Sequence, residues 1–372
     1  MQDLKNKKIL SLGALCILIL LAAFFFRSNL TVYLEKMSPS KKPDLEQRLK
    51  EVNRPANNIA QDLSSFIYTT LSEAESGVFP RSVKCDPQQG TCRTEFSTEA
   101  PYLSFAILSL KDSGNDLYRK RADELMNIVL EGCMSDVGYC DRNFFAMHEY
   151  YLSTGEDKYK EGMMTFGESS LEEKDVLTLM GSNIPAKWSS LYLVTKDERY
   201  KDSLLSLAEK FLNNEFQAVV QTPEIYRSGT TVVYEGMPEM IWGVMLPAYA
   251  LTQDKRYLEY ATYFFDNSNI QNHVYDIWLK RNGSTDVIKS IDALMQISEL
   301  DKERAFEYRA YAKKMLEVIL FNYWDTPERN IINGDKGIYT HVFEKSLNLQ
   351  GWLILQINKF NEEPFTVWVR SE

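Results

Sequence analysis

The sequence predicts an all-α protein: an (α/α)6 toroid of about twelve alternating inner and outer helices, preceded by one N-terminal transmembrane helix. Three observations predict this fold. An uncharged apolar run lies near the N-terminus, a short motif recurs along the rest of the chain, and apolar helical segments alternate with amphipathic ones. The toroid domain is expected to occupy residues 57–372.

The apolar run covers residues 9–26 and carries no charge. Its 18 residues are close to the length that a helix needs to cross the hydrocarbon core of a bilayer. A cleaved secretory signal is the alternative, although the run ends in three phenylalanines rather than in the small residues of a cleavage site. We expect an uncleaved signal-anchor.

Charges around this run predict its orientation. Three lysines precede it within residues 1–8, whereas Arg27 alone follows closely. The positive-inside rule therefore makes residues 1–8 a cytoplasmic tail and places the C-terminal domain outside the cytosol, at a cell surface, in a periplasm or in a secretory lumen. Residues 27–56, rich in Lys, Glu, Ser and Pro, are expected to form a weakly packed stalk.

Four further cysteines form two pairs with identical spacing, Cys85 with Cys92 and Cys133 with Cys140. In an extracytoplasmic domain this spacing predicts two local disulfides, which agrees with the predicted orientation. Four cysteines allow three pairings. A four-cysteine zinc site is the other alternative, although zinc ligands are usually closer together in sequence.

A turn motif recurs along the domain and gives its organisation. Each copy begins with Ser or Thr and ends with Tyr five places later, and a degenerate copy lies near 298–308. Ser, Thr and Asp favour helix caps and turns, so each copy predicts a tight turn between two helices with the Tyr packed back across it. The copies are 113–118, 154–159, 195–200 and 252–257.

Helical periodicity around these turns predicts six helix pairs, and strand signals are confined to short candidates at 217–220 and 230–234. The second helix of each pair is the more apolar, so these six form the inner ring and the amphipathic ones the outer ring. Short turns then lie on one face, and long loops on the other. The expected helices are 57–75, 98–111, 116–132, 142–153, 157–168, 184–195, 198–214, 237–251, 255–268, 284–298, 303–322 and 344–358. The expected long loops are 77–97, 133–141, 169–183, 215–236, 269–283 and 323–343.

This organisation resembles the six-hairpin glycosidase-like superfamily over residues 57–360. The resemblance lies in repeat length, helix number and loop asymmetry, and no residue motif assigns a particular family. It implies glycoside hydrolase, polysaccharide lyase or sugar epimerase chemistry, with the site on the long-loop face at the mouth of the inner ring.

Carboxylates at the starts of inner helices are the candidate catalytic groups. Sugar hydrolysis uses a carboxyl pair, one acid and one base or nucleophile, and helix N-termini favour acidic groups. Each candidate has a structural alternative as a helix cap or a first-turn acid. The candidates are Glu235, Glu239, Asp141 and Asp286.

Candidate substrate-binding residues lie beside these carboxylates. Aromatic rings offer a face to a sugar, Lys187 is suited to a uronate, and His341 with Glu344 offers a proton-transfer pair. Helix-start and packing roles are the alternatives for these side chains. The full set is Arg142, Lys187, Trp188, Tyr234, Trp242, His341 and Glu344.

Several classes of function are disfavoured. A net charge of −10 argues against nucleic-acid binding, which needs a basic face. The sequence contains no glycine-rich phosphate loop, no HExxH and no G-x-S-x-G motif, and its three scattered histidines predict no metal site. No cofactor is expected, and no oligomeric state is predicted.

These observations favour a membrane-anchored, extracytoplasmic protein that acts on a glycan or oligosaccharide. Hydrolysis by paired carboxylates is the expected reaction, with elimination or epimerisation behind it. The alternative is a non-catalytic toroid that binds a glycan or a protein within an envelope or secretory-pathway assembly.

Overall fold

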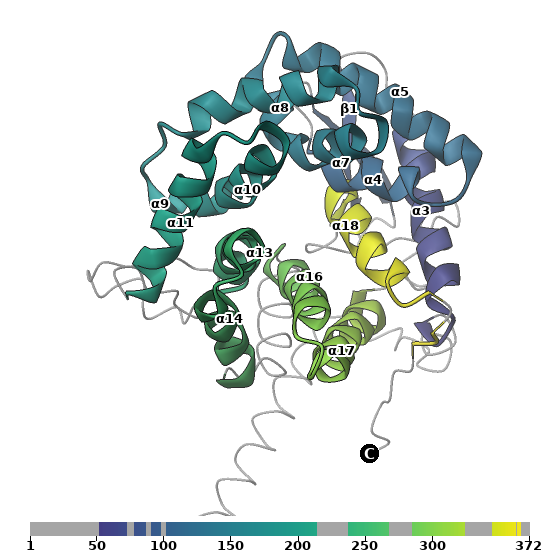
Figure 1. Ribbon diagram of the computed structural model, residues 1–372. Coiled ribbons are helices and arrows are strands. Elements are labelled where there is room, and N and C mark those ends of the chain that lie inside the picture. The colour runs from purple at the N-terminus through teal and green to yellow at the C-terminus, as the bar shows by residue number, and fades with distance from the viewer. Residues whose placement is uncertain are drawn as a thin grey trace, which may run out of the picture. The chain divides into compact units, whose positions relative to one another are not determined.

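Six helical hairpins, arranged as a ring, make up the part of the chain described in this computed structural model (Figure 1). The structure describes residues 52–72, 78–86, 91–97, 102–213, 237–267, 285–323, 344–361 and 363–365. The chain divides into two units, Met1–Leu45 and Glu46–Glu372, and all described residues belong to the second.

Each hairpin combines one inner and one outer helix. The inner helices are α4 (Ser104–Lys111), α7 (Phe144–Thr154), α10 (Ile184–Thr195), the continuous segment α12 (Met237–Met240), η2 (Ile241–Met245) and α13 (Leu246–Thr252), α16 (Thr285–Leu300) and α18 (Leu347–Asn358). The outer helices are α3 (Ala56–Ser72), α5 (Asp116–Cys133), α8 (Asp157–Ser170), α11 (Glu198–Leu212), α14 (Lys255–Asn267) and α17 (Ala305–Tyr323).

The inner helices form a closed ring. Along the chain α4 packs on α7, α7 on α10, α10 on η2, η2 on α16 and α16 on α18, and α18 returns to α4. The ring closes where the first hairpin partner, α3, packs against the last helix, α18. Backbone bonds fasten this seam, since the Ala56 N–H donates to the Glu363 carbonyl (3.1 Å) and the Asn57 N–H to the Asn361 carbonyl (3.0 Å).

Burial follows the sequence pattern. Inner helix α18 buries side chains on every face, whereas outer helix α11 buries a single stripe that runs from Tyr200 to Phe211. A helix that is apolar all round is enclosed, and one with a single apolar stripe is peripheral. The predicted (α/α)6 architecture is therefore confirmed. Most predicted helix ranges agree with those observed to within three residues, but the helix predicted at 98–111 begins at Ser104, and residues 344–346 of the last predicted helix form a strand.

Each copy of the recurring motif forms the tight turn from an inner to an outer helix. The Thr195 hydroxyl donates to the carbonyl one turn earlier (2.7 Å) and accepts from the Asp197 N–H (3.1 Å). Lys196 is left-handed (φ 61°), and the Asp197 carboxylate caps α11 by accepting from the Arg199 N–H (3.0 Å). The turn that begins at Thr252 repeats these contacts.

The arginine that follows three of these turns also joins neighbouring outer helices. Exposed ion pairs of this kind contribute less than about 1 kcal/mol each, so they fix the spacing of the outer ring more than its stability. The pairs are Arg199–Glu168, Arg256–Glu209 and Arg304–Asp266, at 2.7, 2.9 and 2.6 Å.

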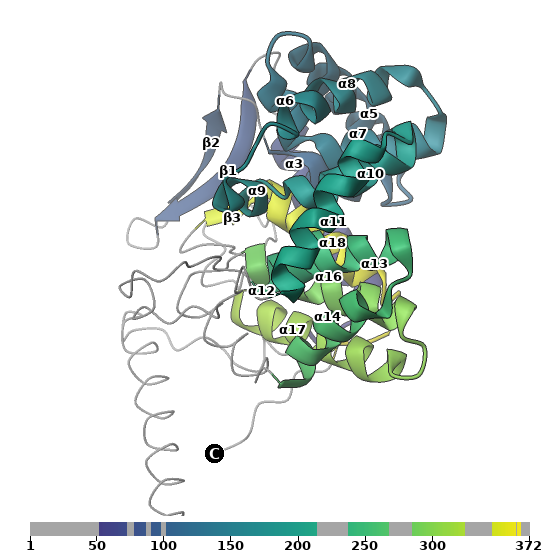
Figure 2. The same ribbon diagram turned by 60° about the vertical axis from the view of Figure 1, so that its left-hand side comes forward.

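The prediction of a loop over 77–97 is wrong. This segment forms an antiparallel hairpin of β1 (Phe79–Asp86) and β2 (Thr91–Ser97), and β3 (Glu344–Ser346) adds to β1. Pro80 and the interspersed charges hid the alternation that marks a strand. The three strands lie to one side of the helices, where β3 leads directly into α18 (Figure 2).

Three further features differ from the sequence prediction. Two predicted long loops contain the short helices α6 (Val137–Arg142) and α9 (Val176–Gly181). The eighth helix contains a π-helical turn, η2, in which the Leu246 N–H bonds the Ile241 carbonyl. Pro247 follows directly after this turn. Within an α-helix, a proline ring clashes with the carbonyl four residues earlier and offers it no N–H, and the wider π-helical turn relieves this clash.

Among the described residues, no helix has the length and apolar character to cross a membrane. The predicted tail at 1–8, the anchor at 9–26 and stalk residues 27–51 lie outside the described residues, as do the strand candidates at 217–220 and 230–234.

Candidate active site

A group of polar side chains lies at the N-terminal ends of the inner helices, and we call these five residues the polar cluster. They are Tyr102, Asp141, Lys187, Glu239 and Lys289. Each lies just before an inner helix or within its first two turns, so successive hairpins bring them to the same end of the ring. The polar cluster thus lies at the ring end where the sequence analysis expects a site.

Asp141 and Lys187 form the first ion pair of the polar cluster. The Lys187 Nζ donates to Asp141 Oδ1 (2.5 Å), and the Lys187 side chain is 1% exposed whereas that of Asp141 is 29% exposed. Burial lowers the pKa of Lys187, the Lys289 charge lowers it further, and the Asp141 carboxylate opposes both effects. The lysine also lies over the Phe166 ring, 4.7 Å from its centroid. Asp141 is therefore the more exposed member of this pair, and the buried Lys187 holds it in position.

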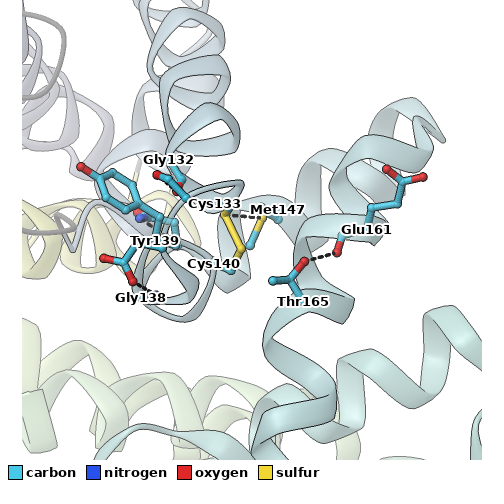
Figure 3. The surroundings of a disulfide bond; sticks show 11 residues. Gly132, Cys133, Gly138, Tyr139, Cys140, Met147, Glu161 and Thr165 are labelled. Atoms are coloured by element: carbon cyan, nitrogen blue, oxygen red, sulfur yellow. Dashed lines mark hydrogen bonds between the residues drawn. A yellow bond between two sulfur atoms is a disulfide. The ribbon is translucent and has the colours of Figure 1, made fainter.

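A disulfide positions Asp141. Cys133 at the end of α5 is bonded to Cys140 in α6, with a Cα–Cα distance of 5.1 Å (Figure 3). The Tyr139 ring lies so close to Gly132 that a Cβ there would be 2.4 Å from it. Asp141 immediately follows the bonded cysteine, so the disulfide and this packing together hold it before α7. The predicted Cys133–Cys140 disulfide is confirmed.

The second predicted cysteine pair lies in the β1–β2 hairpin. Cys92 is disulfide-bonded, and its Cα partner across the two strands is Cys85.

Glu239 and Lys289 form the second ion pair, between α12 and α16. Both side chains are buried, and the Lys289 ammonium donates to Glu239 Oε1. Because the charge of Lys289 lowers the pKa of Lys187, the two ion pairs are neighbours. Two carboxylates and two ammonium groups, from α6 and from three inner helices, thus lie together at one end of the ring.

Tyr102 completes the polar cluster just before α4. More than a third of this residue is exposed, but its hydroxyl is desolvated, which raises the pKa of Tyr102 to about 12, and the Asp141 charge adds to this shift. The Asn183 side chain contacts the hydroxyl from the start of α10. At neutral pH the Tyr102 hydroxyl therefore stays protonated and can donate a hydrogen bond.

Four aromatic rings from four inner helices pack in a closed cycle next to the polar cluster. Phe105 stacks on Trp352 (4.3 Å between centroids) and on Phe145 (5.7 Å). Trp242 contacts Phe145 (5.6 Å) and Trp352 (5.2 Å). Since their helices are the ones that close the inner ring, these rings fill its interior.

Asp292 of α16 fixes the two indoles of this cycle. Its Oδ2 accepts from the Trp242 Nε1 (2.9 Å) and the Trp352 Nε1 (3.0 Å), and its Oδ1 accepts from the Lys359 Nζ (3.1 Å). Both oxygens of Asp292 are engaged, so this carboxylate has a structural role.

The remaining predicted site residues are distributed as follows. Trp188 is 3% exposed and its indole donates to Ser170 of α8 (2.9 Å), so it packs between helices, and we leave it out of the proposed site. Arg142 ends α6, next to Asp141. Glu235, Tyr234 and His341 lie outside the described residues, and the side chains of Asp286 and Glu344 are not described.

From the sequence, Lys289 and Tyr102 were missed, and Asp292 was placed about two turns beyond Asp286, deeper in the same helix, without an assigned role. Lys289 and Asp292 carried a usable signal, because charged residues inside the apolar stretch DVIKSIDALM are buried only when they are paired. Among the described residues, no group of three or more His, Cys, Asp or Glu side chains could hold a metal ion.

Solved structures show where this fold occurs. An unsaturated glucuronyl hydrolase specific for heparin matches with a TM-score of 0.60 at 13% identity, over 82% of this chain and 96% of the other. A variant unsaturated glucuronyl hydrolase from Streptococcus agalactiae, complexed with dGlcA-GalNAc6S, matches with a TM-score of 0.59 at 11% identity, over 86% and 96%. An inactive α-1,6-mannanase variant from a Salegentibacter species, complexed with α-1,6-mannotetrose, gives 0.54 at 12%, over 82% and 98%.

These likenesses show that the chain has the six-hairpin glycosidase-like (α/α)6 toroid fold. No protein-family profile matches the sequence, and no curated protein matches it.

Proposed function

We propose that this protein is a membrane-anchored, extracytoplasmic enzyme that hydrolyses a glycan at the polar cluster. The observation that carries this proposal is Asp141, a partly exposed carboxylate held by the buried Lys187 at the N-terminal ends of the inner helices. A reacting group must be both accessible and fixed in position, and among the described carboxylates of the polar cluster Asp141 combines the two.

Asp141 is suited to act on water or on a sugar. Its Oδ1 is engaged by Lys187, whereas its Oδ2 makes no hydrogen bond to another described residue. We assign Asp141 as general base or nucleophile, and Tyr102 as a hydrogen-bond donor to the substrate. Glu239 is a candidate for the second carboxyl that glycoside hydrolysis uses.

The structural neighbours support glycan processing, since by name they are a glucuronyl hydrolase and a mannanase. One mannanase variant is described as inactive after two adjacent aspartates are replaced. The present sequence contains no two adjacent aspartates. The carboxyl pair proposed here, Asp141 and Glu239, instead combines residues from different hairpins.

The proposed location rests on the N-terminal charges and on the cysteines. The apolar run at 9–26 with its preceding lysines supports a signal-anchor, and the Cys133–Cys140 disulfide supports an oxidising compartment.

The proposal is tested with full-length protein in detergent and a panel of unsaturated glucuronyl disaccharides, α-1,6-mannooligosaccharides and other oligosaccharides. We expect turnover of at least one, and we expect Asp141→Asn to lower kcat by about 10²- to 10⁴-fold, as loss of acid–base catalysis does. Asp202→Asn, an exposed position on α11, is the matched control and should leave kcat unchanged.

Folding is checked separately, because Asp141→Asn leaves the buried Lys187 without its counter-charge. The double variant Asp141→Asn, Lys187→Met removes both charges and should regain stability but not activity. Binding of a glycan without turnover by the wild-type chain would instead favour the non-catalytic toroid.

A further inference from the structure

A cavity lies at the opposite end of the ring from the polar cluster. It has a volume of about 1000 Å³, within the range of small-molecule sites. Its walls are α3, the turn that follows α4 and the C-terminal end of α18. We call it the amide groove, after the side chains of Asn57, Gln61, Asn358 and Asn361, which line it together with Ser64.

The four amides and the Ser64 hydroxyl of the amide groove are unused by the fold. The side-chain amides of Asn57, Gln61, Asn358 and Asn361 make no hydrogen bond to another described residue. Ser64 is only 3% exposed, yet its hydroxyl also has no hydrogen-bond partner among the described residues. The hydroxyl and the four amides therefore line the groove with their hydrogen-bonding capacity unused, and they can serve a bound polar molecule.

Charge excludes an anionic ligand. Asp112 and Asp116 line the amide groove, and burial raises the pKa of Asp112 in spite of the opposing charge of Lys111. Lys359 is the cation among the lining residues, and its Nζ is already bound to Asp292. The groove therefore offers a uronate or a phosphate no free positive charge.

The remaining chemistry suits a neutral sugar. Each side-chain amide both donates and accepts, which matches hydroxyl groups that do the same. Tyr118 lines the groove, and its ring is stacked on Tyr68 (4.6 Å between centroids), which adds a rigid aromatic edge to the amides. Aromatic rings of this kind bury the apolar face of a bound molecule.

We infer that the amide groove is a second carbohydrate-binding site, which takes a neutral oligosaccharide at the ring end opposite the polar cluster. The inference extends the proposed function, since a glycan enzyme with a second sugar site would hold a polymer at both ends of its ring. The site itself rests on the amide groove alone, and its test needs no turnover.

The test measures binding by calorimetry and saturation-transfer NMR. It uses full-length protein carrying Asp141→Asn, in a zwitterionic detergent without a sugar headgroup. The neutral probes are α-1,6-mannotetraose, maltotetraose and chitotetraose, and the anionic probe is an unsaturated glucuronyl disaccharide. We expect at least one neutral probe to bind, and Gln61→Ala with Asn358→Ala to weaken it at least tenfold.

The matched control is Asn213→Ala, which removes an exposed amide at the end of α11 and should leave affinity unchanged. Gln61→Arg, which fills the amide groove from an exposed helix position, serves if the double variant is unstable. Binding of the anionic probe should be indifferent to all three changes. The inference is overturned if no neutral probe binds, or if its affinity is the same in the groove variants as in Asn213→Ala.

Discussion

A single carboxylate, Asp292, connects the aromatic interior of the ring to its far end. It accepts from the indoles of Trp242 and Trp352, and it binds Lys359 at the edge of the amide groove. Both tryptophans are more than nine-tenths buried, so neither indole N–H has water as a ready substitute. The sequence could not predict these three contacts, because the partners are 50 to 67 residues away from Asp292 along the chain.

Asp292→Ala is expected to destabilise the fold by about 2–5 kcal/mol, since it leaves two buried indole N–H groups unpaired. Chemical denaturation of the purified protein gives the free energy of unfolding from the midpoint of the transition and the slope of its dependence on denaturant concentration. Lys359→Met, which removes only a partly exposed ion pair, should cost less than about 1 kcal/mol. Equal, small losses of free energy of unfolding in Asp292→Ala and Lys359→Met would show that the hydrogen bonds from the two indoles to Asp292 do not stabilise the fold.

Among the elements, helices were predictable and strands were not. The Ser or Thr and the Tyr of the recurring motif mark the turns from inner to outer helices, and local hydrogen bonds, such as that from Thr195 to its own helix, determine these turns. The β1–β2 hairpin and the π-turn at η2 depend on tertiary packing and on Pro247, and neither has a comparable periodic signal. For the site, the sequence identified Asp141 and Lys187 separately, but their pairing depends on the ring.

The contact between α18 and α4 requires a glycine. A Cβ at Gly351 would lie 2.3 Å from the Phe105 carbonyl oxygen, so Gly351→Ala should force the two helices apart and cost roughly 3 kcal/mol or more. Gly243→Ala is the matched control on another inner helix, where a Cβ would meet nothing within 4 Å, and it should be neutral or stabilising. Thermal denaturation compares the two, and equal melting temperatures would contradict the close approach.

On the scale of the whole molecule, the proposed signal-anchor at residues 9–26 would determine on which side of a membrane the ring lies. Only sequence bears on this point, because residues 1–45 are outside the described residues. The excess of lysines before the apolar run acts during membrane insertion of the nascent chain, so the expected orientation can be predicted from the sequence without a structure.

The expected orientation is tested with C-terminal fusions of full-length chain expressed in a bacterium. Alkaline phosphatase, which is active only outside the cytosol, should be active, and green fluorescent protein should stay dark. Replacing Lys5, Lys7 and Lys8 by Gln should weaken this asymmetry. A bright fluorescent fusion with an inactive phosphatase would place the ring in the cytosol and contradict the prediction.

The contact between α4 and α18, which closes the inner ring, also has a consequence for folding during synthesis. The Phe105 N–H donates to the Asn348 side chain, which lies 243 residues later in the chain. At typical synthesis rates, Asn348 is therefore added roughly 12–50 s after Phe105. During that interval the apolar surface of α4 has been translated but has no last neighbour to cover it. Exposed apolar surface of this kind is bound by chaperones. The ring is completed only when α18, the last of the described helices to be synthesised, packs on α4.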